Sequence, residues 1–313
     1  MTESQWYKGN IHTHTNESDG DASPEDVVRW YRKHGYDFLV LSDHNHVTIF
    51  KYGKGRRKFK SPLLIPGEEV SARIMKGTVP IHLGAIGISR VVEPVHADSI
   101  VKTIQANVNS IIDAGGIASL NHPNFHWAFD HHAIKNIVGA TMMEVFNGHP
   151  GTNNAGGPGS YSTEEIWDGV LSAGRPIFGA AVDDSHHYHD YSVNMSNPGR
   201  GWIVVRSQKL TQNAIVDALS TGDFYSSTGV TLKRLDATQE SISIEIENYH
   251  NNVYKNVFET RFIGHNGVTL ATSNSMTPVY RIRGNERYVR ATITSSNFMK
   301  AWTQPVFVRN PSD

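Results

Sequence analysis

Short apolar segments that end in histidine or acidic residues recur along the first part of the chain, and amphipathic segments separate several of them. The apolar segments span residues 11–15, 36–44, 63–69, 81–88, 116–122, 141–146 and 176–183. The amphipathic segments span residues 24–34, 99–114 and 163–173. Apolar runs of this length are typical of strands buried on both faces, and their alternation with helices predicts a parallel sheet. Six or seven such units in about 200 residues favour a barrel over an open sheet.

The periodicity changes near residue 230. Ile242, Ile244 and Ile246 alternate with polar residues, and the same alternation returns at residues 289–293. A period of two predicts antiparallel strands with one buried face. The sequence therefore predicts an α/β barrel over residues 1–229, which ends with a strand at 201–205 and a helix at 211–220, and a small β-sandwich over residues 230–313.

The charge balance narrows the classes of protein to which the chain can belong. Its 313 residues include 29 basic and 30 acidic ones, a formal net charge of −1. This balance argues against binding of a nucleic-acid polymer or a membrane surface through bulk charge. The sequence has no cysteine, so metal ligands would be nitrogen and oxygen atoms.

Two further features concern the compartment. No apolar run approaches the roughly 20 residues of a membrane span. The start Met-Thr-Glu-Ser-Gln lacks the basic and apolar regions of a secretory signal. We therefore expect a cytoplasmic protein, although a secreted form whose signal had been removed would look the same.

Histidine and acidic residues gather where the expected strands end, and 15 of the 17 histidines lie at or before His189. The carboxyl ends of barrel strands meet at one face, where the chemistry of barrel enzymes collects. The strand-end residues are His12, His14, Asp19, Asp43, His44, Glu68, Glu69, His82, Asn121, His122, Glu144, Asp183, Asp184 and His186. Imidazole and carboxylate donors suit zinc, manganese or iron, and about nine donors are enough for two or three ions.

The order of these motifs resembles the PHP family, the polymerase and histidinol phosphatase metallohydrolases. The matching motifs are Gly9-Asn-Ile-His-Thr-His14, Asp19-Gly20, Ser42-Asp-His44, Gly67-Glu-Glu69, His82, Asn121-His-Pro123 and Asp184-Ser-His186. Farther along, residues 222–229, Arg290 and residues 301–305 resemble the two-domain branch of the family that includes a carbaryl hydrolase. The resemblance implies a distorted (β/α)7 barrel with up to three divalent metal ions, followed by the small β-sandwich.

The resemblance also implies which residues hold each ion. The first ion would be held by His12, His14, Glu69 and Asp184, the second by Glu69, His82 and His122, and the third by Asp19, His44 and His186. Aspartate at position 19 leaves the occupancy of the third site open. Glu68 is an alternative to Glu69 as the bridging ligand, although the Gly-x-Glu pattern favours Glu69.

Other strand-end residues have less specific roles. We expect Asp43 to orient a neighbouring ligand and Asn121 to shape the loop that presents His122. Glu144 is either a substrate contact or a solvated acid. Asp183 is expected to be structural.

Several loops are candidates for substrate binding. The candidate residues are Lys54, Arg56, Arg57, His126, His149 and His187, with His189 nearby. Each of these histidines is either an exposed side chain or a substrate contact. The run 51–60 carries six cations and no acid, and it is either a solvated loop or a lip that binds an anion such as phosphate. The loop 151–160 is long enough to be a mobile flap.

These features predict a hydrolase that cleaves a small phosphomonoester or phosphodiester by attack of a metal-bridging hydroxide. Glu69, Asp184 and His186 are the expected catalytic residues, with Asp184 or a rim histidine protonating the leaving group. Two alternatives stay open: hydrolysis of a carboxylester or carbamate at the same ions, and an inert barrel whose β-domain binds a partner. The C-terminal part is expected to cover the barrel, to contribute to the pocket or to mediate a homodimer.

Overall fold

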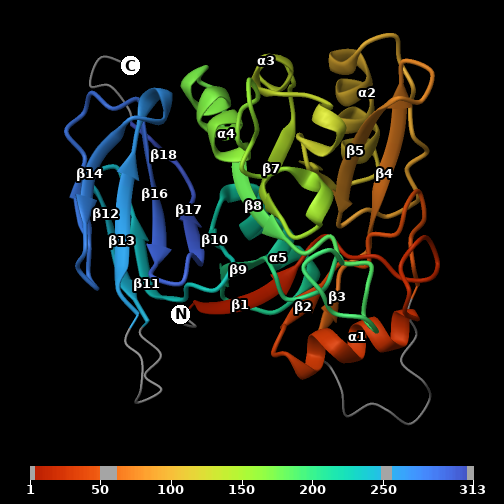
Figure 1. Cartoon of the computed structure of the whole chain (residues 1–313), viewed down its shortest axis with the longest axis horizontal. Helices are drawn as coiled ribbons and strands as arrows, with labels where there is room; N and C mark the ends of the chain where they lie inside the picture. The colour runs from red at the N-terminus through yellow and green to blue at the C-terminus, as the bar shows by residue number, and fades with distance from the viewer. Residues whose placement is uncertain (1–3, 50–61, 248–255, 309–313) are drawn as a thin grey trace.

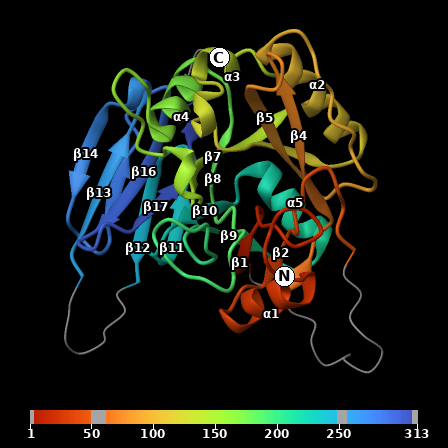
Figure 2. The same ribbon diagram turned by 45° about the vertical axis from the view of Figure 1, so that its right-hand side comes forward.

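The computed structural model describes residues 4–49, 62–247 and 256–308. An α/β region and an antiparallel β-sandwich lie side by side (Figures 1 and 2). Among the described residues, no helix has the length and apolar character that a membrane crossing requires.

The largest sheet runs through both parts of the molecule. Its ten strands follow the order β14-β13-β16-β17-β10-β9-β1-β2-β3, with β18 paired to β16. The strands of the α/β region are β1 (Gln5–Asn10), β2 (Phe38–Leu39), β3 (Leu63–Leu64), β9 (Trp202–Ser207) and β10 (Phe224–Ser227). The strands of the sandwich are β13 (Phe258–Ile263), β14 (Thr269–Ser273), β16 (Tyr288–Ser295), β17 (Lys300–Thr303) and β18 (Val306–Phe307). Because β10 pairs with β17, hydrogen bonds connect the two parts.

A second sheet completes the α/β region. It contains β4 (Gly67–Ile74), β5 (Val79–Ile86), β6 (Ile117–Leu120), β7 (Ala140–Asn147) and β8 (Phe178–Val182). Strands β6, β7 and β8 are parallel, whereas β5 is antiparallel to both β4 and β6. The prediction of a parallel sheet is therefore wrong for this edge. A tight turn at Met75, Lys76 and Gly77, all with positive φ, joins β4 directly to β5 without a helix.

The two sheets do not merge into the closed barrel that the sequence led us to expect. Two isolated bridges join them, one between Thr13 and Ser185 and one between His44 and Glu69. β2 and β3 have only two residues each, and the strand expected at 11–15 is reduced to one bridge residue after β1. The backbone that follows β1 and β2 is therefore irregular, in contrast to the regular strands β4 to β8.

An apolar core with residues from both sheets fills the space between them. Its members include Ile11, Phe38, Val40, Met142, Ala180, Val182 and Ile203. Helix α5 (Gln212–Thr221) packs against this core through Ile215 and Leu219. Gly9 permits the close approach of β1 and β2, since a Cβ atom there would lie 2.2 Å from the ring of Phe38.

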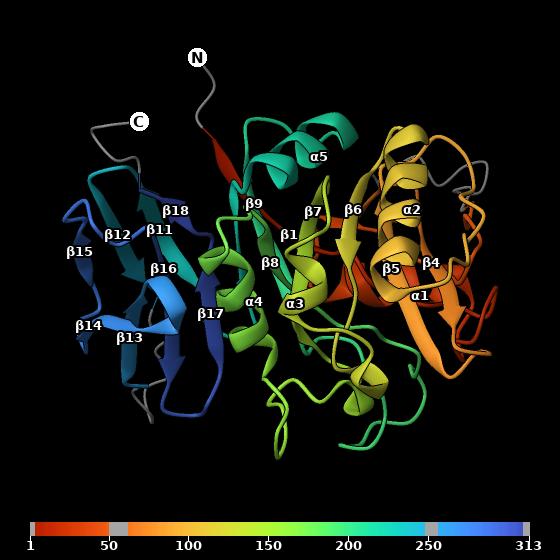
Figure 3. The same cartoon turned by 90° about the horizontal axis from the view of Figure 1, so that it is seen from above.

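Helices α2 (Ile100–Asp113), α3 (His131–Ile134) and α4 (Thr163–Ser172) lie outside the second sheet, as Figure 3 shows. Their apolar faces form one core with strands β4 to β8. Helix α1 (Pro24–Lys33) begins at Ser23, whose side chain accepts a hydrogen bond from the Asp26 N–H. The helices expected at 24–34, 99–114, 163–173 and 211–220 are confirmed within two residues at each end.

The C-terminal antiparallel strands form the two layers of the sandwich. Strands β11 (Leu232–Ala237), β12 (Ser241–Ile246) and β15 (Val279–Arg281) make a three-stranded sheet. Ile242, Ile244 and Ile246 point into a core that also contains Phe262 and Ile293 of the larger sheet. The domain boundary between residues 229 and 230 stays a prediction, because strands from both sides of it, such as β10 and β17, belong to the same sheet.

Candidate metal centre

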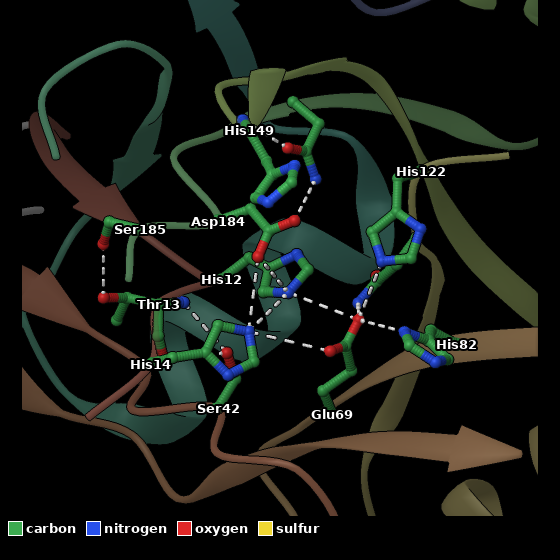
Figure 4. Close-up of polar contacts among 12 residues, drawn as sticks. His12, Thr13, His14, Ser42, Glu69, His82, His122, His149, Asp184 and Ser185 are labelled. Carbon is green, nitrogen blue, oxygen red and sulfur yellow. Dashed lines mark hydrogen bonds and ion pairs between the residues drawn. The ribbon is translucent and has the colours of Figure 1, made fainter. Parts of the chain in front are cut away.

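Nine imidazole and carboxylate side chains converge where the strands of the α/β region end. Glu69 and His82 belong to β4 and β5, and the others follow β1, β2, β6 and β8 in the chain. These donor residues are His12, His14, Asp19, His44, Glu69, His82, His122, Asp184 and His186. Their ligand atoms form overlapping groups, each of which could hold an ion, and most of the side chains are buried. Figure 4 shows six of them: His12, His14, Glu69, His82, His122 and Asp184.

The carboxylate of Glu69 lies at the middle of the donor residues. Its Oε1 is 3.3 Å from His12 Nε2, and its two oxygens also face four further imidazoles. The other distances from Glu69 are 3.6 Å to His14, 3.0 Å to His44, 3.4 Å to His82 and 3.1 Å to His122. A carboxylate in this position can bridge two ions, as the sequence led us to expect for Glu69.

Asp184 is the second buried carboxylate of the cluster. Its Oδ1 lies 3.3 Å from Nε2 of both His12 and His14 and 3.6 Å from Nδ1 of His186. Its Oδ2 accepts a hydrogen bond of 3.0 Å from the Asn147 amide. One oxygen therefore faces the imidazoles while a neutral amide holds the other.

Asp19 forms a third, more exposed group with three imidazoles. Its carboxylate lies 3.5 Å from His14, 3.4 Å from His44 and 3.3 Å from His186. His14 takes part in this group as well as in the buried ones, and His44 contacts both Asp19 and Glu69. The structure thus brings all nine donors together, while their division among individual ions stays a prediction.

Glu144 holds one of the donors in place. Its Oε1 lies 2.6 Å from Nδ1 of His12, and its Oε2 accepts hydrogen bonds from the His122 N–H and the Asn147 amide. The sequence interpretation of Glu144 as a substrate contact or a solvated acid is wrong, because the side chain is buried and both oxygens are used inside the protein. A carboxylate in this place fixes the ring that it contacts.

Asn121 performs a similar task for Glu69. Its amide donates to Oε1 of Glu69 over 2.9 Å, while its carbonyl oxygen accepts from the Gly84 N–H. Glu68, in contrast, points away from the cluster and accepts a hydrogen bond from the Val92 N–H. Burial raises the pKa of Glu68 to about 7. Of the two adjacent glutamates, only Glu69 faces the imidazoles.

Asp43 and Asp183 stabilise the surrounding loops. Asp43 accepts hydrogen bonds from both the N–H and the hydroxyl of Thr15 and from the hydroxyl of Ser18. It therefore fixes the loop that leads to Asp19 and does not contact a donor imidazole directly. Asp183 accepts from the Tyr31 hydroxyl and from two backbone N–H groups, which fits the structural role expected for it.

Burial and charge pairing act against each other within the cluster. Burial raises the pKa of Glu69, but the neighbouring imidazoles, with His12 the largest contributor, lower it well below its usual range. Burial lowers the pKa of His12, yet Asp184, Glu69 and Glu144 together raise it well above its usual range. Without an ion, buried carboxylates are thus compensated by protonated rings.

His14 has the opposite protonation state. Burial and the nearby His186 lower the pKa of His14 to about 4. Burial also opposes protonation of His186, but Asp19 and Asp184 raise its pKa to about 9. A neutral imidazole is the form that ligates a metal, so His14 needs to release no proton to bind one.

The backbone is unusual at two of the donors. His122 and Asp184 have φ values of 25° and 48°, a left-handed conformation that is uncommon for residues with a side chain. His126 and Trp127, a few residues after His122, also have positive φ. Asn124 ties this segment to the loop that follows β7, by hydrogen bonds to the carbonyl oxygens of Asn153 and Tyr161. Such conformations concentrate at functional sites, where the surrounding contacts hold them.

His149 lies at the edge of the cluster, where Figure 4 shows its ring beside Asp184. The centroid of its ring is 5.7 Å from that of His186. Its Nδ1 accepts a hydrogen bond from the Gly151 N–H, so the proton of the neutral ring must sit on Nε2. Burial lowers the pKa of His149, which favours this neutral form.

The other candidates for substrate binding have contacts of their own outside the donor cluster. His126 is exposed and its ring contacts Phe125 at 4.6 Å, while His187 accepts a hydrogen bond from the Ser196 N–H. His189 is exposed and contacts the carbonyl oxygen of Asp21. Lys54, Arg56 and Arg57 fall outside the described residues. The loop 151–160, expected as a flap, is tied to its surroundings by hydrogen bonds through Asn153 and Asn154.

The donor residues fit divalent metal ions. Nitrogen and carboxylate oxygen donors in this number suit zinc, manganese or iron. Nε2 of His82 is buried and has no hydrogen-bond partner among the described residues. Five imidazoles around one carboxylate are also more than hydrogen bonds alone would require. The cluster is therefore consistent with a multinuclear metal site.

Comparison with known proteins supports this architecture at the level of the fold. No protein-family model and no curated protein matches the sequence. A two-domain protein from Bacteroides vulgatus that contains a predicted PHP-like metal-dependent phosphoesterase is similar in structure, with a TM-score of 0.53 and 16% identity over 94% of this chain and 92% of that one.

Two smaller structures resemble part of the chain. One is a protein from Bifidobacterium adolescentis proposed to be a metal-dependent phosphoesterase, with 15% identity over 60% of this chain and 89% of that one, and a TM-score of 0.39. The other is an amidohydrolase from Chromobacterium violaceum with bound sulfate and no metal, with 14% identity over 60% and 93%, and a TM-score of 0.37. The chain thus shares a two-domain fold with the Bacteroides protein. The resemblance to the branch that includes a carbaryl hydrolase stays a prediction.

Proposed function

We propose that the chain is a metal-dependent hydrolase that cleaves small phosphomonoesters or phosphodiesters. One observation carries the proposal: the Glu69 carboxylate lies within 3.6 Å of imidazole nitrogens from five different histidines. Glu69, Asp184 and Asp19 give this cluster three carboxylates, two of them almost fully buried. Buried ionisable groups in such density are costly unless they serve a common ligand.

Two or three divalent ions are the ligand that we assign to the cluster, with manganese, zinc or iron as candidates. His12, His14, Glu69 and Asp184 would hold the first ion, Glu69, His82 and His122 the second, and Asp19, His44 and His186 the third. Bound ions would supply an activated water and positive charge for the substrate oxygens.

The protein residues have separate tasks in this proposal. Glu69 would keep two ions at a fixed spacing, and Glu144 and Asn121 would keep its imidazole neighbours and its own carboxylate in place. Asp184 and His186 lie 3.6 Å apart, and either could accept or return a proton. His149 would donate a hydrogen bond from Nε2 to a phosphoryl oxygen or to the leaving group.

Two observations favour a phosphoester over another ester. The similar Bacteroides protein contains a predicted PHP-like metal-dependent phosphoesterase. The sequence also has the basic run 51–60, from which Lys54, Arg56 and Arg57 would offer positive charge to a phosphate. We propose a small molecule as the substrate rather than a nucleic-acid polymer, because the overall charge is balanced.

The test combines elemental analysis with matched substrates. Protein purified without chelator should contain two to three equivalents of manganese, zinc or iron. It should hydrolyse a chromogenic phosphomonoester or phosphodiester faster than a carboxylester or a carbamate with the same leaving group. Preference for the carboxylester or carbamate would replace the phosphoester assignment, and metal-free protein that stays inactive after metal addition would refute the hydrolase.

Two neighbouring glutamates provide a matched pair of variants. Glu69→Gln removes the central charge and should lower both the bound metal and the rate by at least tenfold. Glu68→Gln changes a buried glutamate one position away that faces the opposite side, and it should keep both near the wild-type level. If the two variants had the same metal content and the same rate, the bridging role proposed for Glu69 would be refuted.

A further inference from the structure

A cavity lies between helix α4 and the sheet face formed by β13, β16 and β17. Its volume is about 890 Å³, within the range of roughly 300–1,000 Å³ that is common for small-molecule sites. Its charged lining residues are Glu164, Glu165, Asp168, Arg261, Arg290 and Lys300. It includes none of the nine donor residues, so it is separate from the candidate metal centre.

All three acids of this cavity already have partners. Asp168 accepts two hydrogen bonds from Arg290, of 2.8 Å to Nε and 2.6 Å to a terminal nitrogen. Glu164 accepts a hydrogen bond of 2.6 Å from Lys300. Glu165 caps the first turn of α4. The three lining carboxylates therefore already accept hydrogen bonds from groups of the protein. None of them is free to pair with a cationic ligand.

Within residues 4–49, 62–247 and 256–308, Arg261 is the charged residue of the lining that has no hydrogen-bond or ion-pair partner. It stands opposite Thr292 in the ladder between β13 and β16, and the Thr292 hydroxyl donates a hydrogen bond to Glu164 of α4. Side chains of directly opposite residues share one face of a sheet, so Arg261 belongs to the face that α4 covers. It is partly buried, yet its side chain has no hydrogen bond or ion pair among the described residues.

A second polar group lines the cavity from helix α3 of the α/β region. His131 lines the cavity, and its Nδ1 is buried without a hydrogen-bond partner among the described residues. A guanidinium stays charged at all ordinary pH values and presents five N–H donors in a planar fork. This geometry matches a carboxylate or a phosphate. An unpaired Arg261 beside fully committed acids therefore favours a ligand with an anionic group.

We propose that this cavity is a binding site for a small molecule with a carboxylate or phosphate group, and that Arg261 is the residue that holds the group. The site is independent of the proposed hydrolase activity. It joins the α/β region to the sandwich, since α4 belongs to one and β13, β16 and β17 belong to the other.

Calorimetric titration of the full chain tests the site. The protein is first treated with a chelator, so that anions cannot bind through metal ions, and is then titrated separately with inorganic phosphate and with succinate. At least one of the two should bind, and the tighter one identifies the anionic group. Arg261→Gln should weaken that binding by about tenfold or more, because a charged hydrogen bond is lost.

Two further variants make the result specific. Arg281→Gln removes an exposed arginine on β15 of the other sheet and should bind the anion as the wild-type chain does. Arg261→Lys keeps the positive charge but loses the planar guanidinium, so it should bind the anion with an affinity between those of the wild type and Arg261→Gln. If Arg261→Gln does not fold, Arg261→Lys serves as the test variant. The proposal is overturned if neither anion binds the wild-type protein, or if folded Arg261 variants bind it with unchanged affinity.

Discussion

Nδ1 of His12 lies 2.6 Å from a carboxylate oxygen of Glu144, while Nε2 of the same ring faces Glu69 and Asp184 at 3.3 Å. The ring is therefore held on one side by a buried acid and presents its other nitrogen to the cluster. An acid that orients a ligating histidine fixes the ring and its tautomer and raises the affinity for the metal. Glu144 thus supports the candidate metal centre although it is not one of the nine donor residues.

Glu144→Gln should lower the affinity for the divalent ion about 10-fold to 100-fold, because glutamine cannot offer His12 a charged acceptor. Titration of metal-free protein with manganese measures the effect. Glu93→Gln, at an exposed acid in the loop before α2, serves as the control and should bind manganese like the wild-type chain. Unchanged affinity in Glu144→Gln would mean that the contact is only structural.

Metal ions should stabilise the folded chain. A ligand that binds only the folded state at a free concentration of 100 times its Kd adds about 2.7 kcal/mol to the free energy of unfolding. Thermal unfolding of chelator-treated protein should therefore shift to higher temperature when manganese is added. The shift should disappear in the double variant His82→Ala/His122→Ala if the second ion is the main contributor, and a wild-type protein insensitive to the ion would contradict the assignment of the cluster.

The buried pair of Asp168 and Arg290 should be important for stability. Arg290 is 1% exposed, and Asp168 also accepts a hydrogen bond from the Tyr288 hydroxyl. Asp168→Asn removes the carboxylate that accepts two hydrogen bonds from the buried Arg290 guanidinium and leaves Glu164, 3.6 Å away, as its counter-charge; this loss should lower the free energy of unfolding by about 3 kcal/mol. Chemical denaturation measures the loss. Asp217→Asn, at an exposed acid of α5, should change stability little, and equal effects of the two substitutions would argue against the buried pair.

Glu164 should make stability depend on pH in the acid range. Burial raises the pKa of Glu164, but Arg290 and Lys300 lower it below its usual value. Because the folded-state pKa is the lower one, the stabilisation is complete above the ordinary glutamate pKa of about 4.3 and is lost as the pH falls through the folded-state value. The difference in melting temperature between wild type and Glu164→Gln should therefore be largest near neutral pH and shrink below pH 4. A difference that stays constant with pH would exclude this contribution.

The helices of the α/β region were predictable because each has its own local signals. Ser23 and Pro24 mark the start of α1, and Gly222 in a left-handed conformation ends α5. The direction of a strand has no such signal. An apolar run such as 81–86 is compatible with parallel or antiparallel neighbours, and only the short turn at Gly77 decides that β5 runs back along β4. For the same reason the expected alternation of strands and helices is wrong between β4 and β5, which a turn joins directly.

The donor residues were predictable from motif order, whereas their supports were not. His12 and His14 stand two apart and before a polar turn, which is visible in the sequence. Glu144 looks like any acid at the end of a strand, and only the fold brings it to His12, 132 positions away. β1 was not predicted, because its apolar residues Trp6 and Tyr7 are adjacent and are followed by Lys8, so the segment shows neither a continuous apolar run nor strict alternation. Contacts of this kind depend on tertiary structure and leave little local trace.

The two isolated bridges between the sheets, Thr13 with Ser185 and His44 with Glu69, would give the proposed metal ions a second role as a link between the sheets. His12 and His14 continue the sheet of β1, while Glu69 and His82 belong to the sheet of β4. An ion bound by side chains of both sheets would be a removable cross-link. It would lie where the backbone joins the sheets only through isolated bridges. Hydrogen exchange at the amides of His14 and Asn45, which lie at the two bridges, should therefore slow when the metal is loaded, long before the paired interior of β9 responds.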